Sequence, residues 1–205
     1  MRADVAQGEA LAQLRELITA DGGELAAALA DEPAADAFGS LVAASGRCRG
    51  RASDYALLIE SILEGYLVHY QRPRLIEPPD EGLRLLAGDY LYALGLSRLA
   101  ALGDLEAVRE LADVIGLCAQ AHSGPEPPPP DVPEAIWALG ALGVAGGPWD
   151  AGEAAKQGLR EGRPDAPAAA LEAALRRTAE LGIEQAAQLA LIAFIRQHVS
   201  DPAST

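Results

Sequence analysis

Two carboxylates stand four residues apart in the segment DYALLIESILEGYLVHYQ, at Glu60 and Glu64. On a helix, residues at this spacing lie on the same face, so the two side chains stack beside each other. Like charges this close repel unless water, a cation or a basic partner lies between them. Because magnesium binds a few carboxylates together with substrate phosphates, the pair is a candidate magnesium site. A solvated helix face is the other interpretation of the same spacing.

A further carboxylate, Asp89, stands inside the apolar helical segment LLAGDYLYALGLSRLAALG. A charged side chain in such a segment needs a partner, because an unpaired charge among apolar residues is costly. One interpretation is structural, with Asp89 bonded to a neighbouring helix or to Arg72, Arg74 or Arg84. The other is that Asp89 takes a direct part in substrate chemistry.

Other common chemical motifs are absent from the sequence. It contains no phosphate-binding loop, dinucleotide fingerprint, HExxH, GxSxG or calcium-loop pattern. The histidines His69, His122 and His198 lie far apart in the chain, so we expect each at a helix end or on the surface. The cysteines have no CxxC spacing, which argues against a zinc site or a disulfide framework. We expect Cys118 to be buried and Cys48 to be exposed.

The composition predicts an all-α protein. Of the 205 residues, 50% are hydrophobic and 4% aromatic, Ala and Leu dominate, and alternating runs of Val, Ile and Thr are absent. The net charge of −14 repels phosphate backbones and anionic lipid surfaces, so we expect no nucleic-acid partner. The opening residues MRADVAQGEA lack the apolar core of a signal peptide, and charges interrupt the longest apolar stretches. We therefore expect a cytoplasmic protein without a membrane span.

Apolar periodicity and helix-breaking residues divide the chain into helices. We expect them over roughly residues 5–20, 24–30, 34–45, 53–71, 81–102, 104–121, 166–181 and 183–199. Ser53 or Asp54, Asp80 and Asp104 are the expected N-caps, and Gly103 is the expected C-terminal stop.

Two of these helices carry enough apolar residues to predict how they pack. The helix over 81–102 is apolar around so much of its girth that we expect it at the centre of the domain. The helix over 104–121 should face inward with Val108, Leu111, Ile115 and Ala119.

The organisation expected is one helical bundle with an internal connector. Residues 1–122 form its N-terminal part, and SGPEPPPPDVP over 123–133 is a stiff polyproline-type connector that cannot be helix. Residues 134–200 supply the C-terminal helices of the same bundle, and 201–205 form a disordered tail. The segment EAIWALGALGVAGGPW is either one helix with close backbone packing or an irregular ligand-facing segment.

The segment LLIESILEGYLVHYQRPRLIEPPDEGLRLLAGDYLYA resembles the central helices of the trans-isoprenyl diphosphate synthases. That family carries a first aspartate-rich motif, Asp-Asp-x-x-Asp, on a helix, and a Gly-Asp-Tyr-Leu-like segment follows about one helix later. Here Gly88–Leu91 matches the second feature directly, without a gap in the spacing. The resemblance covers roughly 56–121, and the closing ALEAALRRTAELGIEQAAQLALIAFIRQHV is similar to the final helices of the family.

The family's functional positions carry different residues in this chain. Glu60, Ser61 and Glu64 occupy the three aspartate positions of the first motif. His69 and Tyr70 occupy the positions of the arginine pair that would grip a diphosphate.

Further along, the sequence departs from the family more strongly. Arg72 and Arg74 stand just beyond the place of the arginine pair. Where the second aspartate-rich motif should lie, residues 121–205 contain no Asp-Asp pair, and Asp150 and Asp165 are isolated. The chain is also about one third shorter than the resemblance implies.

The resemblance implies an isoprenoid-synthase-type helical bundle, with Glu60 and Glu64 as Mg²⁺ ligands and Arg72, Arg74 and Asp89 as substrate-binding residues for an isoprenyl diphosphate. Catalysis in that family needs a magnesium cluster that holds and ionises the allylic diphosphate. Fewer carboxylates and arginines would forfeit most of this electrostatic assistance. We therefore expect a non-catalytic accessory subunit, a homo- or hetero-oligomer that pairs with a catalytic prenyl synthase and shapes its apolar product site.

Two alternatives stay open. One is an active prenyl-diphosphate-binding enzyme whose altered metal motif is Glu60 and Glu64. The other is a helical interaction module with no isoprenoid link, in which exposed apolar faces bind protein partners. A deep apolar cavity below Glu60 favours an isoprenoid function, and a filled core there favours the interaction module.

Overall fold

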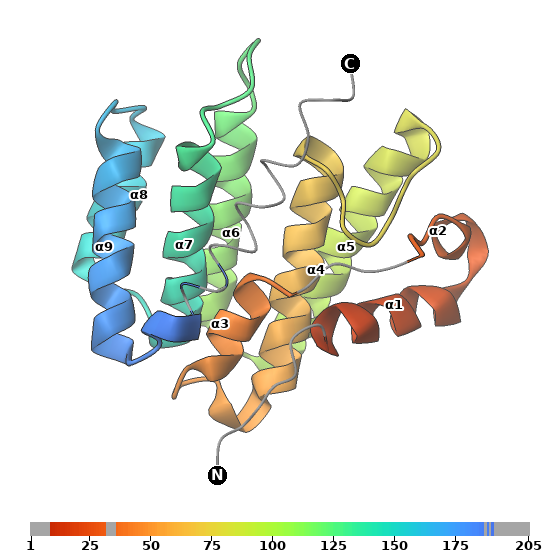
Figure 1. The fold of residues 1–205 in the computed structure, drawn as a ribbon, viewed down its shortest axis with the longest axis horizontal. Coiled ribbons are helices and arrows are strands. Elements are labelled where there is room, and N and C mark those ends of the chain that lie inside the picture. The colour runs from red at the N-terminus through yellow and green to blue at the C-terminus, as the bar shows by residue number, and fades with distance from the viewer. Residues whose placement is uncertain (1–8, 32–35, 187, 189, 191–205) are drawn as a thin grey trace.

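The computed structural model describes residues 9–31, 36–186, 188 and 190, and this part of the chain folds into helices (Figure 1). The sole β-type pairing found in it is an isolated bridge between Leu29 and Ile76. The all-α prediction is confirmed, whereas the isoprenoid-synthase type of bundle stays a prediction. The elements are α1 (Glu9–Asp21), α2 (Gly23–Ala27), α3 (Phe38–Ala44), the 3₁₀ turn η1 (Arg49–Arg51), α4 (Ala52–Tyr70), α5 (Glu81–Leu102), α6 (Leu105–Ala121), α7 (Asp131–Gly146), α8 (Asp150–Arg160) and α9 (Ala166–Leu181).

Consecutive long helices pack as neighbours along the molecule (Figure 1). α4 packs on α5, α6 on α7, and α8 on α9, while α7 also contacts α9 and α3. α1 and α3 pack on α4, so that α4 is covered from several sides. The largest apolar core joins α3, α4, α6, α7 and α9, and a smaller one joins α1, α4 and α5.

The central helix is α4, not α5 as the apolar girth of residues 81–102 predicted. Every residue of α4 from Tyr55 to Val68 is buried, including the carboxylates at 60 and 64. α5 lies at the periphery, where Leu85 and Leu86 are 50% and 65% exposed. Its buried side is rich in small residues, and a Cβ placed on Gly95 would lie 2.5 Å from Cγ1 of Ile62. α5 therefore approaches α4 closely with one narrow side and turns the rest of its apolar surface outward.

α5 is also a candidate membrane-spanning helix, whereas the sequence predicted no membrane span. By length and composition alone α5 could cross a membrane, and 28% of its most apolar window is buried inside the structure. One such helix is weak evidence, because the core helix of a protein passes the same test. The absence of a membrane span stays a prediction.

The predicted caps of α5 and α6 are confirmed. Asp80 accepts a hydrogen bond from the amide of Leu83 at 2.8 Å, and Asp104 accepts one from Ala107 at 3.1 Å. Gly103 ends α5 with a φ of 71°, a left-handed conformation that glycine adopts without strain. The cap predicted for α4 is wrong, because α4 continues from η1, its N-cap is Arg51 and no side chain caps it.

The C-terminal half corrects the predicted elements in two places. α7 begins at Asp131, so Pro133 lies in its first turn, where a missing N–H costs no helical hydrogen bond. The segment EAIWALGALGVAGGPW, for which the sequence allowed either a helix or an irregular structure, is helical as far as Gly146. It is buried from Ala135 to Ala145. α8 was not predicted, because its buried positions are mostly Gly, Ala and Lys156 rather than large apolar residues.

The inward side of α6 is partly as predicted. Leu111 is fully buried, but Val108 and Ile115 are half-buried and Ala119 is exposed. The helix is rotated toward α7, so that Val114 takes the inward position instead.

Both cysteines are buried, which confirms the prediction for Cys118 and makes that for Cys48 wrong. Cys48 is 1% exposed because the turn before α4 folds over the end of α7, with Sγ 3.7 Å from the carbonyl oxygen of Val144. Burial raises the pKa of both thiols.

The helices predicted at the two ends of the chain lie only partly within the described residues. The helix predicted over 5–20 is described from Glu9 onward. Of the helix predicted over 183–199, residues 184–186 are helical, and most of the remainder, like the predicted tail at 201–205, lies outside the described residues.

Two glycines inside helices test the close approach of α4 and α5. We expect Gly95→Ala to lower the free energy of unfolding by about 1–3 kcal/mol, because its methyl group would overlap Ile62. Gly116→Ala on α6 is the matched control, since nothing lies within 4 Å of the added Cβ. It should raise stability by about 0.5–1 kcal/mol through helix propensity. Urea denaturation of both variants measures the difference, and equal effects of the two substitutions would contradict close α4–α5 packing.

Candidate functional site

The carboxylates at Glu60 and Glu64 lie inside the protein, on either side of a buried guanidinium. Arg74, from the connector between α4 and α5, places Nη1 2.7 Å from Oε2 of Glu60 and Nε 3.0 Å from Oε2 of Glu64. Both glutamates are 0% exposed, and the Arg74 side chain is 1% exposed. The helical spacing that brings the carboxylates together is therefore matched by a cation supplied within the same chain.

Backbone amides occupy the other oxygen of each carboxylate. Oε1 of Glu60 accepts hydrogen bonds from the amides of Ala37 and Gly39, at 2.8 and 2.6 Å. Gly39 is needed for this approach, since a Cβ there would lie 2.8 Å from Cγ of Glu60.

Glu64 holds the connector in the same way. Its Oε1 accepts from the amides of Arg74 and Leu75, at 2.8 and 2.7 Å. Thus Glu60 fixes the start of α3, and Glu64 fixes the segment before α5.

Burial and the ion pairs act in opposite directions on these groups. Loss of hydration raises the pKa of Glu60, and the nearby Arg74 charge opposes that rise. Burial alone would lower the pKa of Arg74, but the two glutamates raise it above its ordinary value, so that it stays a cation. One cation between two carboxylates makes the cluster a structural ion set as it stands.

The donor set around Glu60 and Glu64 fits a guanidinium rather than a magnesium ion. Every carboxylate oxygen faces an amide N–H or Arg74, so a metal ion would have to displace Arg74. Among the residues that the structure describes, no group of three or more His, Cys, Asp or Glu side chains is placed to hold a metal. Magnesium binding at Glu60 and Glu64 stays a prediction.

The three predicted substrate-binding residues lie in different surroundings. Arg74 is inside the ion set, and Arg72 is exposed on the connector. Asp89 is 77% exposed on α5, and its Oδ1 lies 3.3 Å from Nε2 of His69. The partner that Asp89 finds is thus a histidine of α4, not one of the arginines considered from the sequence.

Two histidines that are distant in sequence meet around one tyrosine. Tyr70 stacks on His122 with ring centroids 4.3 Å apart, and His69 lies 5.8 Å from the Tyr70 ring on its own helix. The Tyr66 hydroxyl is 3.2 Å from Nε2 of His122. Sequence reasoning missed this cluster, although the up-down order of α4, α5 and α6 brings the C-terminal ends of α4 and α6 to the same end of the molecule (Figure 1).

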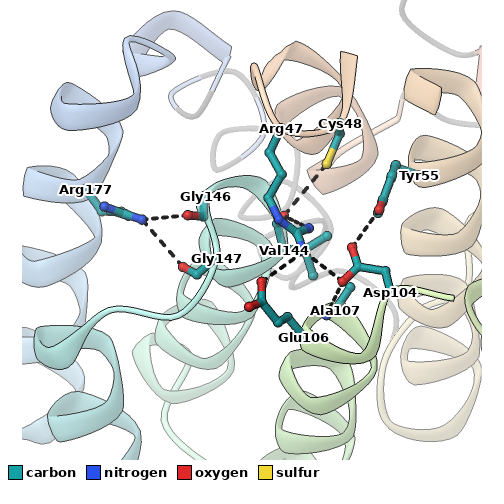
Figure 2. Close-up of polar contacts among 10 residues, drawn as sticks. All are labelled: Arg47, Cys48, Tyr55, Asp104, Glu106, Ala107, Val144, Gly146, Gly147 and Arg177. Carbon is teal, nitrogen blue, oxygen red and sulfur yellow. Dashed lines mark hydrogen bonds and ion pairs between the residues drawn. The ribbon is translucent and has the colours of Figure 1, made fainter. Parts of the chain in front are cut away.

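A third polar cluster ties the end of α7 to its neighbours (Figure 2). Arg47 donates to the carbonyl oxygen of Val144 at 2.9 Å and to Oδ1 of Asp104 at 2.7 Å. The Tyr55 hydroxyl donates to Oδ2 of Asp104 at 2.6 Å. Arg177 of α9 donates to the carbonyl oxygen of Gly146 at 2.9 Å. Two arginines therefore satisfy C-terminal carbonyls of α7, where a positive charge is favourable.

The same contacts shift the acid–base behaviour of Asp104 and Tyr55. Burial alone would raise the pKa of Asp104, but hydrogen bonds from Arg47 and Tyr55 lower it to about 2. Burial, together with the hydrogen bond to Asp104, raises the pKa of Tyr55 to about 12. Asp104 is thus held as a carboxylate and Tyr55 as a neutral phenol, which is the combination that a structural clamp requires.

A fourth cluster joins α6 to α8. The ammonium group of Lys156 is buried and lies 3.1 Å from Glu110, 2.8 Å from Asp113 and 2.6 Å from Glu153. These carboxylates raise the pKa of Lys156 against the opposing effect of burial. The lysine is therefore a fixed cation rather than a nucleophile.

Cavities of the described structure lie away from these clusters. One, of about 480 Å³, lies between the α6–α7 connector and the α8–α9 turn. Another, of about 400 Å³, lies between α1, α4 and α5. Neither is lined by Glu60, Glu64 or Arg74. Residues around the ion set, such as Ile59 and Leu63, are fully buried.

Comparison of the chain with protein-family models, with curated proteins and with solved structures finds no match. The site is therefore interpreted from its own geometry.

Removal of the buried cation tests the ion set. We expect Arg74→Met to lower the free energy of unfolding by about 3–5 kcal/mol at neutral pH, because two carboxylates stay buried without a cation. Arg72→Met, its exposed neighbour on the connector, is the control and should change stability by less than about 0.5 kcal/mol. Urea denaturation of both variants gives the comparison.

The pH dependence of the same variant has a definite sign. Without Arg74, the pKa of Glu60, already raised by burial, rises further above its unfolded value. The folded variant then holds a proton that the unfolded chain lacks, so its deficit should shrink as pH falls toward the ordinary glutamate range. A deficit that is equal at neutral and acidic pH would contradict the ion set.

The Asp104 clamp predicts a second pH-dependent difference. Asp104→Asn keeps a cap acceptor but removes the charge, and should cost about 1–3 kcal/mol at neutral pH. Because the folded-state pKa of Asp104 is about 2, its stabilising effect is complete above the unfolded pKa of about 3.9 and is lost as pH falls toward 2. The two proteins should therefore converge in stability over that acid range. Glu106→Gln, at a 61% exposed partner of Arg47, is the control and should cost less than about 1 kcal/mol.

Proposed function

We propose that this protein is a non-catalytic helical subunit that binds a second, different protein through the outer face of α5 and α6. The outer face consists of eight exposed apolar or glycine residues on these two consecutive helices. Its members are Leu85, Leu86, Ala93, Ala100, Leu105, Ala112, Gly116 and Ala119.

The spacing of the outer face carries the proposal. On α5, Leu86, Ala93 and Ala100 are exposed and stand seven residues apart. On α6, Leu105, Ala112 and Ala119 repeat the same interval, and Leu105 is 79% exposed. Residues seven apart lie on the same side of a helix, so each set forms a stripe, or seam, against which another helix can pack. Alanines and glycine in that seam allow a partner helix to approach closely.

The charge of the chain favours a partner that is not a second copy. The chain carries 30 acidic and 16 basic residues. In the described part of the chain four carboxylates and two basic groups are buried, so the surface keeps most of the net negative charge. Two copies would bring strongly acidic surfaces together, whereas a partner with basic residues beside an apolar helical seam would be attracted.

The filled core around Glu60 favours protein binding over an isoprenoid pocket, and the resemblance in the sequence supplies only the first partner to test, a catalytic prenyl synthase. The non-catalytic part of the proposal is supported by the ion set, in which Arg74 takes the place beside Glu60 and Glu64 that a metal-bound diphosphate would need. If the two proteins pair, this chain would also shape the apolar product site of the synthase.

The outer face is tested by one substitution and a matched control. Ala112→Glu places a charge in the seam and should weaken binding to a purified catalytic prenyl synthase from the same organism at least tenfold, since a charge buried in an interface without a partner is costly. Ala169→Glu adds the same charge at an exposed alanine of α9 and should leave binding unchanged. Sedimentation velocity of the mixed proteins gives the dissociation constants.

Three outcomes would contradict the proposal. If Ala112→Glu instead dissolves a homodimer, a second copy covers the outer face. If the chain stays monomeric with the synthase, this partner is wrong. Magnesium-dependent binding of farnesyl diphosphate, measured by calorimetry and lost in the Glu60→Ala, Glu64→Ala double variant, would favour the active-enzyme alternative.

A further inference from the structure

The cavity between the α6–α7 connector and the α8–α9 turn has no part in the function proposed above. Both turns stand at the same end of the molecule (Figure 1). The volume of about 480 Å³ falls within the range of small-molecule sites, about 300–1,000 Å³. None of its lining residues belongs to the outer face or to the Arg74 ion set.

Prolines make the wall of this cavity rigid. Five of the fourteen prolines in the chain line it, three from the connector, one from the α8–α9 turn and one from the first turn of α9. A proline ring has almost no rotamer freedom to lose, so such a wall is formed before a ligand arrives. The flat faces of proline rings suit a flat apolar group laid against them.

The floor of the cavity is apolar and comes from three helices. Leu117 of α6, Ile136 of α7 and Leu159 of α8 contribute to the lining, and each is at most 9% exposed. Their burial ties the floor to the main core, which fixes its shape. A ligand that reaches the floor therefore gains apolar contact without rearranging the helices.

The rim carries more negative than positive charge. Glu126 and Asp131 line the cavity on the connector side, and in the described part of the chain neither forms an ion pair. Arg163 lines the opposite side, where a Cβ on Gly158 would meet Nη2 of Arg163 and where Nε of Arg163 lies 3.9 Å from Glu161. The guanidinium thus has the Glu161 carboxylate nearby, and Glu126 of the connector and Asp131 at the start of α7 are left to face a ligand.

From this combination we infer that the cavity binds a small molecule with a flat apolar ring and a cationic end. The ring lies between the proline wall and the floor of Leu117, Ile136 and Leu159. The cation lies at the rim, toward Glu126 and Asp131. A ligand of the opposite charge meets the same floor but is repelled at the rim.

Three probes with one ring system separate these contributions. Tryptamine, indole and indole-3-acetate are titrated into the purified full chain by calorimetry, at low and at physiological salt. Tryptamine should bind most tightly, indole less tightly and indole-3-acetate least. Added salt should narrow the gap between the two charged probes, because their contacts at the rim are exposed.

Substitutions then locate the site. Glu126→Gln and Asp131→Asn should each weaken tryptamine roughly threefold, as expected for an exposed ion pair, and leave indole unchanged. Glu77→Gln, an exposed glutamate of the α4–α5 connector, is the control and should change neither probe. Ala121→Leu adds volume at the cavity lining and should weaken all three probes at least tenfold.

The inference would be overturned by any of three results. These are no binding of any probe at millimolar concentration, equal affinity for tryptamine and indole-3-acetate, or probe binding that Ala121→Leu leaves unchanged. If Ala121→Leu does not fold, amide chemical shifts of the unmodified chain decide the matter. Tryptamine should perturb residues 117, 132 and 159, and perturbation confined to other residues would overturn the inference.

Discussion

The guanidinium of Arg74, buried between Glu60 and Glu64, is the interaction on which the arrangement of the N-terminal half depends. α4 is buried along most of its length, and two carboxylates cannot enter such a helix without a compensating cation. Because Arg74 supplies that cation from the connector, the chain must return across α4 before α5 can begin. The amides of Ala37 and Gly39 hold a third segment to the same ion set. Removal of the Arg74 side chain would thus leave these segments bonded through their amides to two carboxylates that have lost their cation.

Basic residues paired with carboxylates also hold the helices of the C-terminal half together. Lys156 is buried among carboxylates of α6 and α8, and Arg47 joins the turn before α4 to the start of α6 and to the end of α7. Arg74 and Lys156 are the basic residues buried in the described part of the chain, and each is paired with carboxylates. One consequence is structural, since helices rich in Ala and Gly offer little apolar area and gain directional contacts from the ion pairs. The other concerns the surface, which keeps the negative charge that steers partners and ligands.

Local signals in the sequence predicted much of the fold. Residues 81–102 and 166–181 form helices with the expected bounds, because Asp80, Gly103 and Gly182 mark their ends. α8 could not be found from apolar periodicity, since small residues and Lys156 occupy its buried side. The central position of α4 was equally hidden, because its charged residues suggested a solvated face. Burial of a charged helix depends on a cation elsewhere in the chain, and no pattern within α4 reveals Arg74.

At the candidate site too, the spacing of residues in the sequence does not reveal which group binds the two glutamates. Two glutamates one helical turn apart have the same geometry whether a metal ion, water or an arginine lies between them, so the source of positive charge decides the chemistry. In this chain the source is covalently attached and buried, and so it needs no ligand from solution. A guanidinium also lacks the open coordination positions through which magnesium would grip a diphosphate. A buried arginine between the two glutamates holds the helix and its connector together without a metal ion. What such a chain offers the proposed protein partner is surface, and the exposed apolar residues spaced seven apart on α5 and α6 are the part of that surface suited to another helix.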